Sequence, residues 1–370
     1  MNSDNRALLR LFLEFLFRRR SPALLIMRLG AGLIAAALGA GFVFNVAVPV
    51  AGGSVNFGFN TGDGLPLTLI FSVVALGAVL VVVGLLFELW RYRDEQIRLN
   101  RKVVLAIEAR GLREGVGRPL SDSVPEHLEG RRQQFLLDLR QSVEDGVVVS
   151  PEAVLRRLRS LNQEVARLVE GRDRADVSLV YGGMAPVPFT FLSGLLLDDE
   201  DRITVMDWDR NDKRWRELDE NDDGKRFKVS GLDEASGNEV VVAVSTSLYS
   251  VLDSNLAMVF PELSVVRLDL DGASQDAHWS ERKQIDLAAE FLRVVGQLDA
   301  KGVRHIHLVI SVQNSVAFRL GAVYDKKNLP PVSVYQFEFG STPPYPWSVS
   351  MPVAGKSDPE VIFTSQQAVT

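Results

Sequence analysis

Two long stretches without a charged residue constrain this chain more than any other feature. No charged side chain occurs between Arg28 and Asp63, and none occurs from Leu65 to Phe87. Each stretch is long enough to cross a hydrocarbon core about 30 Å thick. The sequence therefore predicts two transmembrane helices, at about residues 24–50 and 65–90, and excludes a wholly soluble protein.

The charges around these stretches predict how the hairpin is inserted. All 11 Lys and Arg residues of the first 102 lie at residues 6–28 and 91–102, and the connecting segment 51–64 has none. Basic flanks stay on the cytoplasmic side, so we expect both termini in the cytoplasm. A cleaved secretory signal is the alternative, but the second span that follows so soon disfavours it.

Amphipathic segments lie on both sides of the hairpin. Residues 5–20 predict a helix in the membrane interface, or else an extension of the first span, and the membrane region ends at residue 92. Gly32, Ala36 and Ala40 repeat every four residues, as on surfaces where membrane helices approach closely. Helical patterns over residues 93–175 predict a cytoplasmic helical connector.

From residue 176 the pattern changes to short β-rich runs that alternate with helices. The predicted strands are residues 177–181, 203–208, 239–245, 264–270, 304–311 and 331–339. The predicted helices are residues 188–197, 247–257, 280–302 and 315–325. This alternation predicts an α/β fold with mostly parallel, Rossmann-like sheets, which bind ligands at the carboxyl ends of their strands.

An internal repeat lies within this region. Residues 179–209 and 308–338 share the order strand, polar loop, short helix reaching a glycine, acidic turn and strand, and Gly194 aligns with Gly321. Two related halves would bring equivalent strand-end loops together at a central crevice.

The residues favour binding over catalysis. The chain has no cysteine, no glycine-rich phosphate motif and only four histidines, so the sequence nominates no catalytic residue, no metal site and no cofactor. The strand-end loops instead carry small donors that can hold an anion. Because residues 103–370 are acidic overall, with 30 basic and 41 acidic residues, we expect a small phosphorylated ligand and no DNA or RNA. The expected contacts are Met184, Ala185, Pro186, Val187, Pro188, Phe189, Ser245, Thr246, Ser247, Tyr249, Ser311, Val312, Gln313, Asn314, Ser315 and Phe318.

Two segments resemble a known family. YGGMAPVPFTFLSG and HIHLVISVQNSVAFRLG, with the closing VSVYQFE, resemble the SAVED domain over about residues 176–352, which leaves 353–370 as a tail. The resemblance implies two fused CARF-like Rossmann units that sense cyclic oligonucleotides, made by bacterial nucleotidyltransferases in the antiphage systems called CBASS. The family's second motif usually carries a proline where this chain has Gln313 and Asn314.

With two spans ahead of that domain, the whole chain is similar to the two-transmembrane SAVED effectors. The resemblance implies a multi-pass protein of the bacterial inner membrane that is no enzyme. It would bind a cyclic oligonucleotide from a cognate nucleotidyltransferase, form homo-oligomers and disrupt the lipid bilayer, causing cell death or growth arrest. Two alternatives stay open: a membrane-tethered nuclease or ring nuclease that cleaves the ligand, and a scaffold that recruits another effector.

The topology can be tested by labelling single cysteines in this cysteine-free chain. We expect a membrane-impermeant thiol reagent to label a cysteine placed within residues 51–64 of intact spheroplasts, because that segment faces outward. A cysteine placed after Arg93 should react only after the membrane is permeabilised. Labelling of that second cysteine from outside would contradict the predicted orientation.

Overall fold

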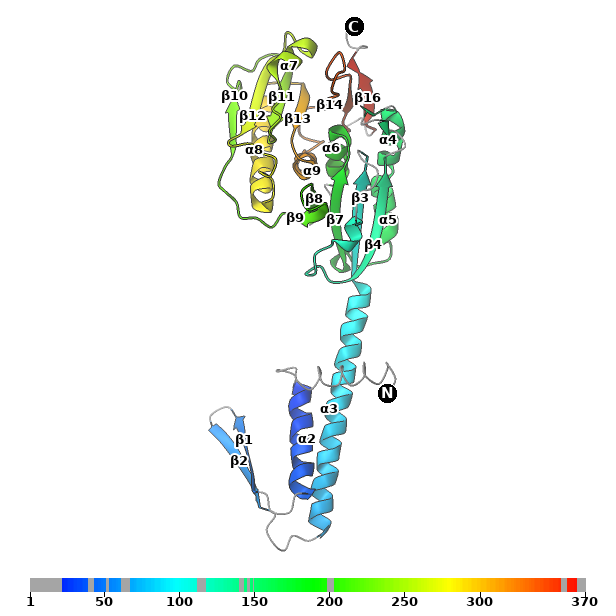
Figure 1. The fold of residues 1–370 in the computed structure, drawn as a ribbon, viewed down its shortest axis with the longest axis vertical. Helices are drawn as coiled ribbons and strands as arrows, with labels where there is room; N and C mark the ends of the chain where they lie inside the picture. The colour runs from blue at the N-terminus through cyan, green and yellow to red at the C-terminus, as the bar shows by residue number, and fades with distance from the viewer. Residues whose placement is uncertain are drawn as a thin grey trace. The chain divides into compact units, whose positions relative to one another are not determined.

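The structure is a computed structural model. It describes residues 22–38, 43–50, 53–60, 67–111, 118–139, 143–144, 147–148, 150–197, 203–353 and 358–364. The chain divides into two units, Met1–Asn100 and Arg101–Thr370 (Figure 1). The interfacial helix expected at residues 5–20 lies outside the described residues.

The first unit is built on two helices in backbone contact, α2 (Pro22–Leu38) and α3 (Leu67–Arg101). A Cβ atom added to Gly30 would lie 2.6 Å from the carbonyl oxygen of Gly77, and one added to Gly77 would lie 2.7 Å from that of Gly30. Further along α3, a Cβ atom on Gly84 would lie 2.9 Å from the Ala23 carbonyl oxygen. Glycine therefore sets the spacing of this hairpin, as it does in many membrane helix pairs.

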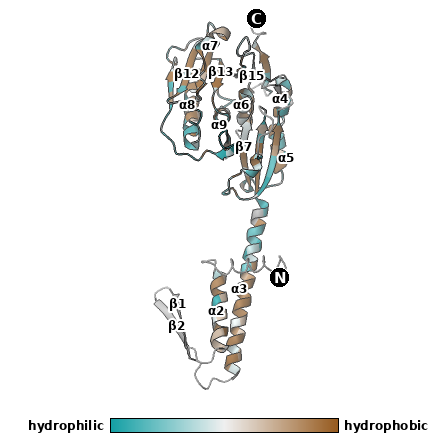
Figure 2. Ribbon diagram, viewed as in Figure 1, coloured by the Kyte–Doolittle hydropathy of each residue, from teal (hydrophilic) through white to brown (hydrophobic). Residues whose placement is uncertain are grey.

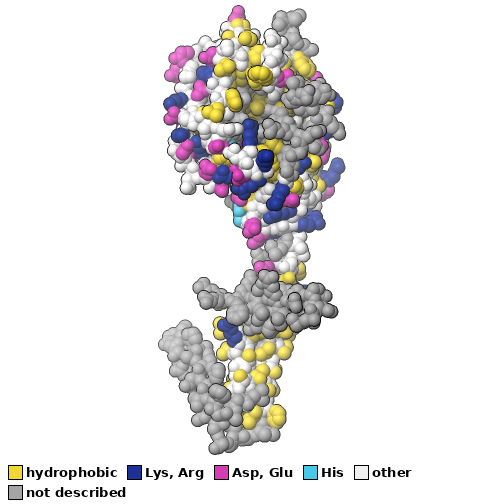
Figure 3. Space-filling model, in the orientation of Figure 1, with side chains coloured by type: hydrophobic (Ala, Val, Ile, Leu, Met, Phe, Trp, Pro, Cys, Tyr) yellow, Lys and Arg dark blue, Asp and Glu magenta, His cyan; other side chains and the backbone are white. Residues whose placement is uncertain are grey.

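The outer surface of the hairpin is apolar along most of its length (Figures 2 and 3). The side chains of Leu76, Val82 and Leu86 on α3 are more than half exposed. Residues Thr68–Ile97 are long and apolar enough to cross a membrane. An exposed apolar surface of this extent fits a lipid environment.

The first predicted span is corrected by the structure. Helix α2 has 17 residues and is followed by β1 (Val43–Val50), which pairs antiparallel with β2 (Gly53–Asn60). The helix expected over residues 24–50 therefore ends within the apolar stretch. β1 has the sequence VFNVAVPV, whose β-branched residues favour a strand and whose Pro49 cannot continue a helix.

The second unit contains a five-stranded sheet with the order β4-β3-β7-β8-β9. The strands are β3 (Val103–Arg110), β4 (Arg131–Asp138), β7 (Val177–Met184), β8 (Ile203–Asp209) and β9 (Arg214–Glu217). The first four run parallel, and β9 is antiparallel to β8.

Strands β3 and β4 overturn the prediction of a purely helical connector over residues 93–175. Val103 to Ile107 are all buried, because β3 lies between β4 and β7 and is covered on both faces. Glu108 follows in the same strand, and its buried carboxylate accepts hydrogen bonds from the Leu120 N–H and the Gln134 side chain. Helices do occur in this region, as α4 (Pro151–Arg159) and α5 (Leu161–Val169). Its other short elements are η1 (Leu120–Asp122), η3 (Arg174–Asp176), β5 (Val143–Glu144) and β6 (Val147–Val148).

A seven-stranded sheet with the order β10-β12-β11-β13-β14-β15-β16 forms the rest of this unit. Its strands are β10 (Phe227–Ser230), β11 (Glu239–Ser245), β12 (Ser264–Leu270), β13 (His305–Ser311), β14 (Val332–Gln336), β15 (Trp347–Ser350) and β16 (Glu360–Phe363). Its helices are α7 (Asp253–Val259), α8 (Glu281–Ala300) and α9 (Asn314–Ala322), and α6 (Val187–Leu196) follows β7. All six predicted strands are confirmed, and so are three of the four predicted helices. The helix predicted at residues 247–257 is α7, which starts later than expected, at Asp253.

The repeat is visible in the structure as two strand–helix–strand units, β7-α6-β8 and β13-α9-β14, whose strands pair in parallel. Their helices cross at the aligned glycines, each the eighth residue of its helix. A Cβ atom on Gly194 would lie 2.0 Å from the Phe318 carbonyl oxygen, and one on Gly321 would lie 2.0 Å from that of Phe191. The contact is therefore reciprocal, as expected for two halves related by a pseudo-twofold axis.

We predict that Gly194→Ala destabilises the second unit by roughly 2–4 kcal/mol, because the new methyl group collides with backbone that cannot move alone. Gly296→Ala in α8 is the matched control, since no heavy atom lies within 4 Å of its added Cβ. That change should raise stability by about 0.5–1 kcal/mol through helix propensity. Thermal unfolding of the full chain in detergent would measure both, and equal melting temperatures would contradict the proposed close contact.

Candidate functional site

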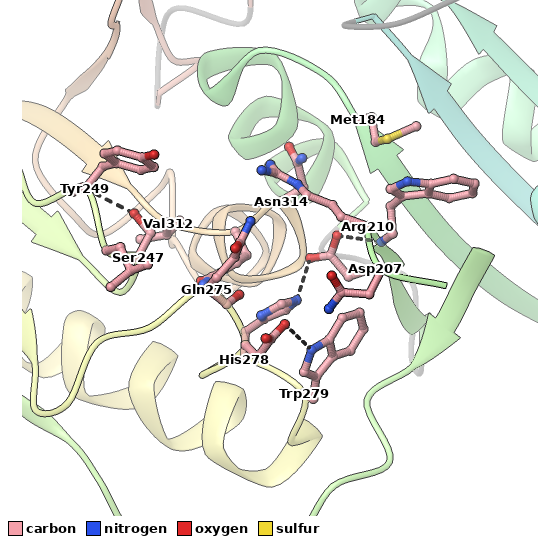
Figure 4. Close-up of a pocket in the computed structure, with 15 residues that line it drawn as sticks. Met184, Asp207, Arg210, Ser247, Tyr249, Gln275, His278, Trp279, Val312 and Asn314 are labelled. Carbon is pink, nitrogen blue, oxygen red and sulfur yellow. Dashed lines mark hydrogen bonds and ion pairs between the residues drawn. The ribbon is translucent and has the colours of Figure 1, made fainter. Parts of the chain in front are cut away.

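Loops from both repeat halves enclose a pocket of about 420 Å³ (Figure 4). It lies where β7, β8, β11 and β13 end, which is the position expected for a ligand in parallel α/β sheets. The lining residues are Met184, Asp207, Trp208, Arg210, Asn211, Ser247, Leu248, Tyr249, Gln275, Asp276, His278, Trp279, Val312, Gln313 and Asn314.

The loop between β13 and α9 is held in place by side-chain hydrogen bonds. Gln313 accepts a bond from the Thr246 hydroxyl (2.7 Å) and donates one to the Ser274 carbonyl (3.1 Å). The hydroxyls of Ser247 and Ser311 are hydrogen-bonded at 3.1 Å. These bonds join the ends of β11 and β13 to the loop before α8, so this wall of the pocket is organised in advance of ligand binding.

Two further hydrogen bonds cross between the repeat halves. The Thr190 hydroxyl of α6 donates to the Asn314 side-chain oxygen (3.2 Å). The Ser315 N–H at the start of α9 donates to the carboxylate of Asp207, at the end of β8 (3.0 Å). A carboxylate at a helix N-terminus is stabilised by the free N–H groups and the helix dipole. Asp207 therefore caps α9 from the other repeat half and places its carboxylate in the lining of the pocket.

His278 and Trp279 form the opposite wall. Their rings lie 4.3 Å apart, and the indole N–H of Trp279 donates to Asp276 (3.2 Å). The Arg216 guanidinium lies 4.7 Å from the Trp279 ring centroid, on the ring face, as in a cation–π contact. Nε2 of His278 lies 3.6 Å from Asp207. Burial lowers the pKa of His278, and the neighbouring carboxylates only partly offset it.

Aromatic and amide side chains also border the open side. Tyr249 is 83% exposed and Trp208 is half-buried beside the pocket, while Asn211 and Gln275 present amides. Arg210 is exposed and makes no ion pair with any residue that the structure describes. Flat rings, amides and a free guanidinium are the groups that contact bases and phosphates.

Six of the sixteen residues expected at the site line this pocket: Met184, Ser247, Tyr249, Val312, Gln313 and Asn314. The other ten do not line it: Ala185, Pro186, Val187, Pro188, Phe189, Ser245, Thr246, Ser311, Ser315 and Phe318. Several of these are buried in the core beneath the loops that line the pocket. Phe318, for example, is buried and stacks on Tyr181 with ring centroids 3.9 Å apart. Contact with a ligand stays a prediction for every one of the sixteen.

Nine lining residues are not among the sixteen expected contacts. Eight of them lie at the end of β8, directly after it or in the loop before α8, namely Asp207, Trp208, Arg210, Asn211, Gln275, Asp276, His278 and Trp279, and the ninth is Leu248. The signal was available, because residues 203–208 and 264–270 were predicted as strands and ligands bind at strand ends. Among the described residues, no group of three or more His, Asp or Glu side chains is placed to hold a metal ion.

Comparisons with known proteins match both parts of the chain. The model of the SMODS-associated and fused to various effectors sensor domain, SAVED, matches residues 161–351, and that of the SAVED-fused 2TM effector domain matches residues 5–155. The sequence matches no curated protein.

Solved structures similar to this chain include two receptors. The Acinetobacter baumannii Cap4 SAVED/CARF-domain containing receptor with the cyclic trinucleotide 2′3′3′-cAAA has 10% identity and a TM-score of 0.45, with 77% of this chain and 58% of that chain covered. The Moraxella osloensis Cap4 SAVED/CARF-domain containing receptor has 12% identity and a TM-score of 0.43, with 77% and 57% covered. This chain therefore spans less than two thirds of the length of either receptor.

Proposed function

This chain belongs to the SAVED family of sensor domains, and we propose that it binds a cyclic oligonucleotide in the pocket between its two repeat halves. The observation that carries this proposal is the pocket itself, which joins the strand ends of both halves. A ligand with repeated nucleotides suits a pocket built by a repeat. Tyr249 and Trp208 supply surfaces on which bases can stack, and Arg210 can pair with a phosphodiester.

We propose that the membrane unit is the output of this sensor in antiphage defence. The match to the two-transmembrane effector domain and the apolar surface of α3 support an integral membrane protein. A ligand from a cognate nucleotidyltransferase would bind the cytoplasmic sensor, favour self-association and thereby permeabilise the inner membrane. Ligand binding can drive this assembly only if the assembled protein binds the ligand more tightly than the unassembled protein does.

The hairpin limits which surface can join one copy to another. Gly30, Gly77 and Gly84 are used inside the hairpin, where α2 and α3 touch. The small residues expected to join one copy to another are Gly32, Ala36 and Ala40. Ala36 is buried, and Ala40 lies outside the described residues. Gly32 is partly exposed and stays available for a contact with a second copy.

The experiment that tests the function is a ligand panel assayed by mobility shift with the full chain in nanodiscs. The panel holds 2′3′3′-cAAA, 3′3′3′-cAAA and the cyclic di- and tetranucleotides of adenine and guanine. We expect one ring to bind tightly, to be recovered intact and to cause dye leakage from liposomes that contain the protein alone. Recovery of cleaved ligand would favour the nuclease alternative, and binding without leakage would favour the scaffold.

Asn314→Asp should weaken binding of that ring by more than about 1 kcal/mol, roughly a fivefold rise in Kd, because it adds a carboxylate beside an anion. The change keeps the oxygen that accepts the Thr190 bond, so the fold should survive. Asn162→Asp is the control, since Asn162 is exposed at the start of α5 and outside the pocket lining. Unchanged affinity in folded Asn314→Asp protein would remove this loop from the binding site.

Gly32→Leu should leave ring binding unchanged and reduce ligand-triggered leakage severalfold, because added bulk separates surfaces that associate through small residues. Gly30→Leu is the contrasting variant, and it should impair insertion, since the side chain would collide with Gly77 and Val81 within the hairpin. Insertion, affinity and leakage would be measured on the same preparations. Normal leakage from inserted Gly32→Leu protein would exclude this surface from the assembly.

A further inference from the structure

His278 is a buried titratable side chain without a hydrogen-bond partner. Neither ring nitrogen makes a hydrogen bond, although the residue is only 5% exposed. Buried polar atoms almost always have a partner, because an unsatisfied one costs about 1–3 kcal/mol. His278 lines the pocket and lies beside Asp207 (Figure 4), so a bound ligand is the partner that its position permits.

The ring is fixed in place by its surroundings. Trp279 lies against one side of it, and the His278 carbonyl accepts a bond from the buried Gln284 side chain (2.7 Å). The Gln275 carbonyl is near the ring, without the geometry of a hydrogen bond. Both ring nitrogens are themselves buried, so a ligand group reaches one of them only when the loop that carries His278 shifts.

Charges from several elements act on this ring. Asp207 from β8, Asp276 from the loop before α8 and Glu220 from the segment after β9 all lie near enough to favour its protonated form. Among cations, Arg210 lines the pocket, whereas Arg216 lies over the Trp279 ring and is paired with Asp219 and Glu220. The charged side chains that line the pocket are thus two carboxylates and one guanidinium, so neutral His278 leaves the lining with an excess of negative charge.

This excess conflicts with the binding of a polyanion. Each nucleotide of a cyclic oligonucleotide brings one phosphodiester charge, and repulsion by a carboxylate is strong in a partly desolvated site. A protonated imidazole would neutralise the lining and supply two N–H donors, one toward Asp207 and one toward the ligand.

We propose that His278 takes up a proton from solvent when the ligand binds, and that the imidazolium then bridges the Asp207 carboxylate and a phosphodiester of the ligand. This inference rests on the proposed function and adds a specificity-determining residue to it. His278 thereby selects for an anion and makes sensing depend on pH.

The sign of the pH dependence follows from the two states of the pocket. Burial lowers the pKa of His278 in the free protein, and a nearby phosphodiester raises it in the complex. The affinity that His278 contributes is therefore complete below the free-state pKa and is lost as the pH rises through the pKa of the complex. Between these two values Kd rises by up to about tenfold per pH unit.

The test uses the full chain in nanodiscs and the tightest-binding ring of the panel, starting with 2′3′3′-cAAA and 3′3′3′-cAAA. Titration calorimetry at pH 7 in two buffers of different ionisation enthalpy measures proton uptake directly, and Kd is measured at pH 6 and pH 8. We expect uptake of a substantial fraction of one proton and a Kd about tenfold higher at pH 8. Phosphodiesters do not titrate in this range, and comparison with a variant that lacks His278 identifies the group that takes up the proton.

His278→Gln removes the titration and keeps a hydrogen-bonding side chain. We expect weaker binding at pH 6, a nearly flat pH profile and no proton uptake that depends on this residue. His127→Gln is the matched control, because His127 is exposed, lies 3.9 Å from Glu217 and is outside the pocket lining. That variant should behave like the wild type.

Each result separates the inference from the function on which it rests. Tight wild-type binding without proton uptake would overturn the role of His278 and leave the sensor intact, and it needs no variant to fold. Retained pH dependence in His278→Gln protein would also overturn it. Failure of every ring to bind at either pH would overturn the proposed function and this inference together.

Discussion

The architecture of the second unit depends on the contact between the α6 and α9 backbones. Helices packed through ordinary side chains keep their axes about 8–10 Å apart, whereas two glycines at the crossing let backbone meet backbone. Each glycine faces a carbonyl oxygen of the other helix, at Phe318 and Phe191. The close approach places both helices in one core with the two sheets, in which Tyr181 stacks on Phe318.

The pocket follows from this crossing. Because each helix succeeds a parallel strand, their crossing brings the ends of β7 and β13 to a common opening, and the hydrogen bonds to Asn314 and Ser315 fix it. The bond from the Ser315 N–H to Asp207 uses a helix-start donor that would otherwise be free for an anion. In the proposed complex, recognition of the anion is therefore left mainly to side chains, above all to Arg210 and His278.

How much the sequence predicts depends on how local each signal is. The strands at residues 239–245 and 264–270 agree with β11 and β12 because a run of β-branched residues between turns is a local signal. β3 was missed because its apolar run directly continues a charged helical pattern, and only its neighbours in the sheet make it a strand. The repeat indicated the crevice and the loop before α9. The repeat could not indicate His278, because His278 lies outside both repeated segments, in the loop before α8 that borders the pocket.

The position of β3 bears on how sensors and effectors can be exchanged between proteins. The effector match extends to residue 155 and the sensor match begins at residue 161, yet β3 and β4 precede that junction and belong to the same sheet as β7. A sensor cut at the junction would lose two strands and leave β7 as a bare edge, open to pairing with other chains. A sensor that keeps its sheet must therefore begin before Val103, so recombination that respects the fold exchanges the membrane helices and leaves β3 in place.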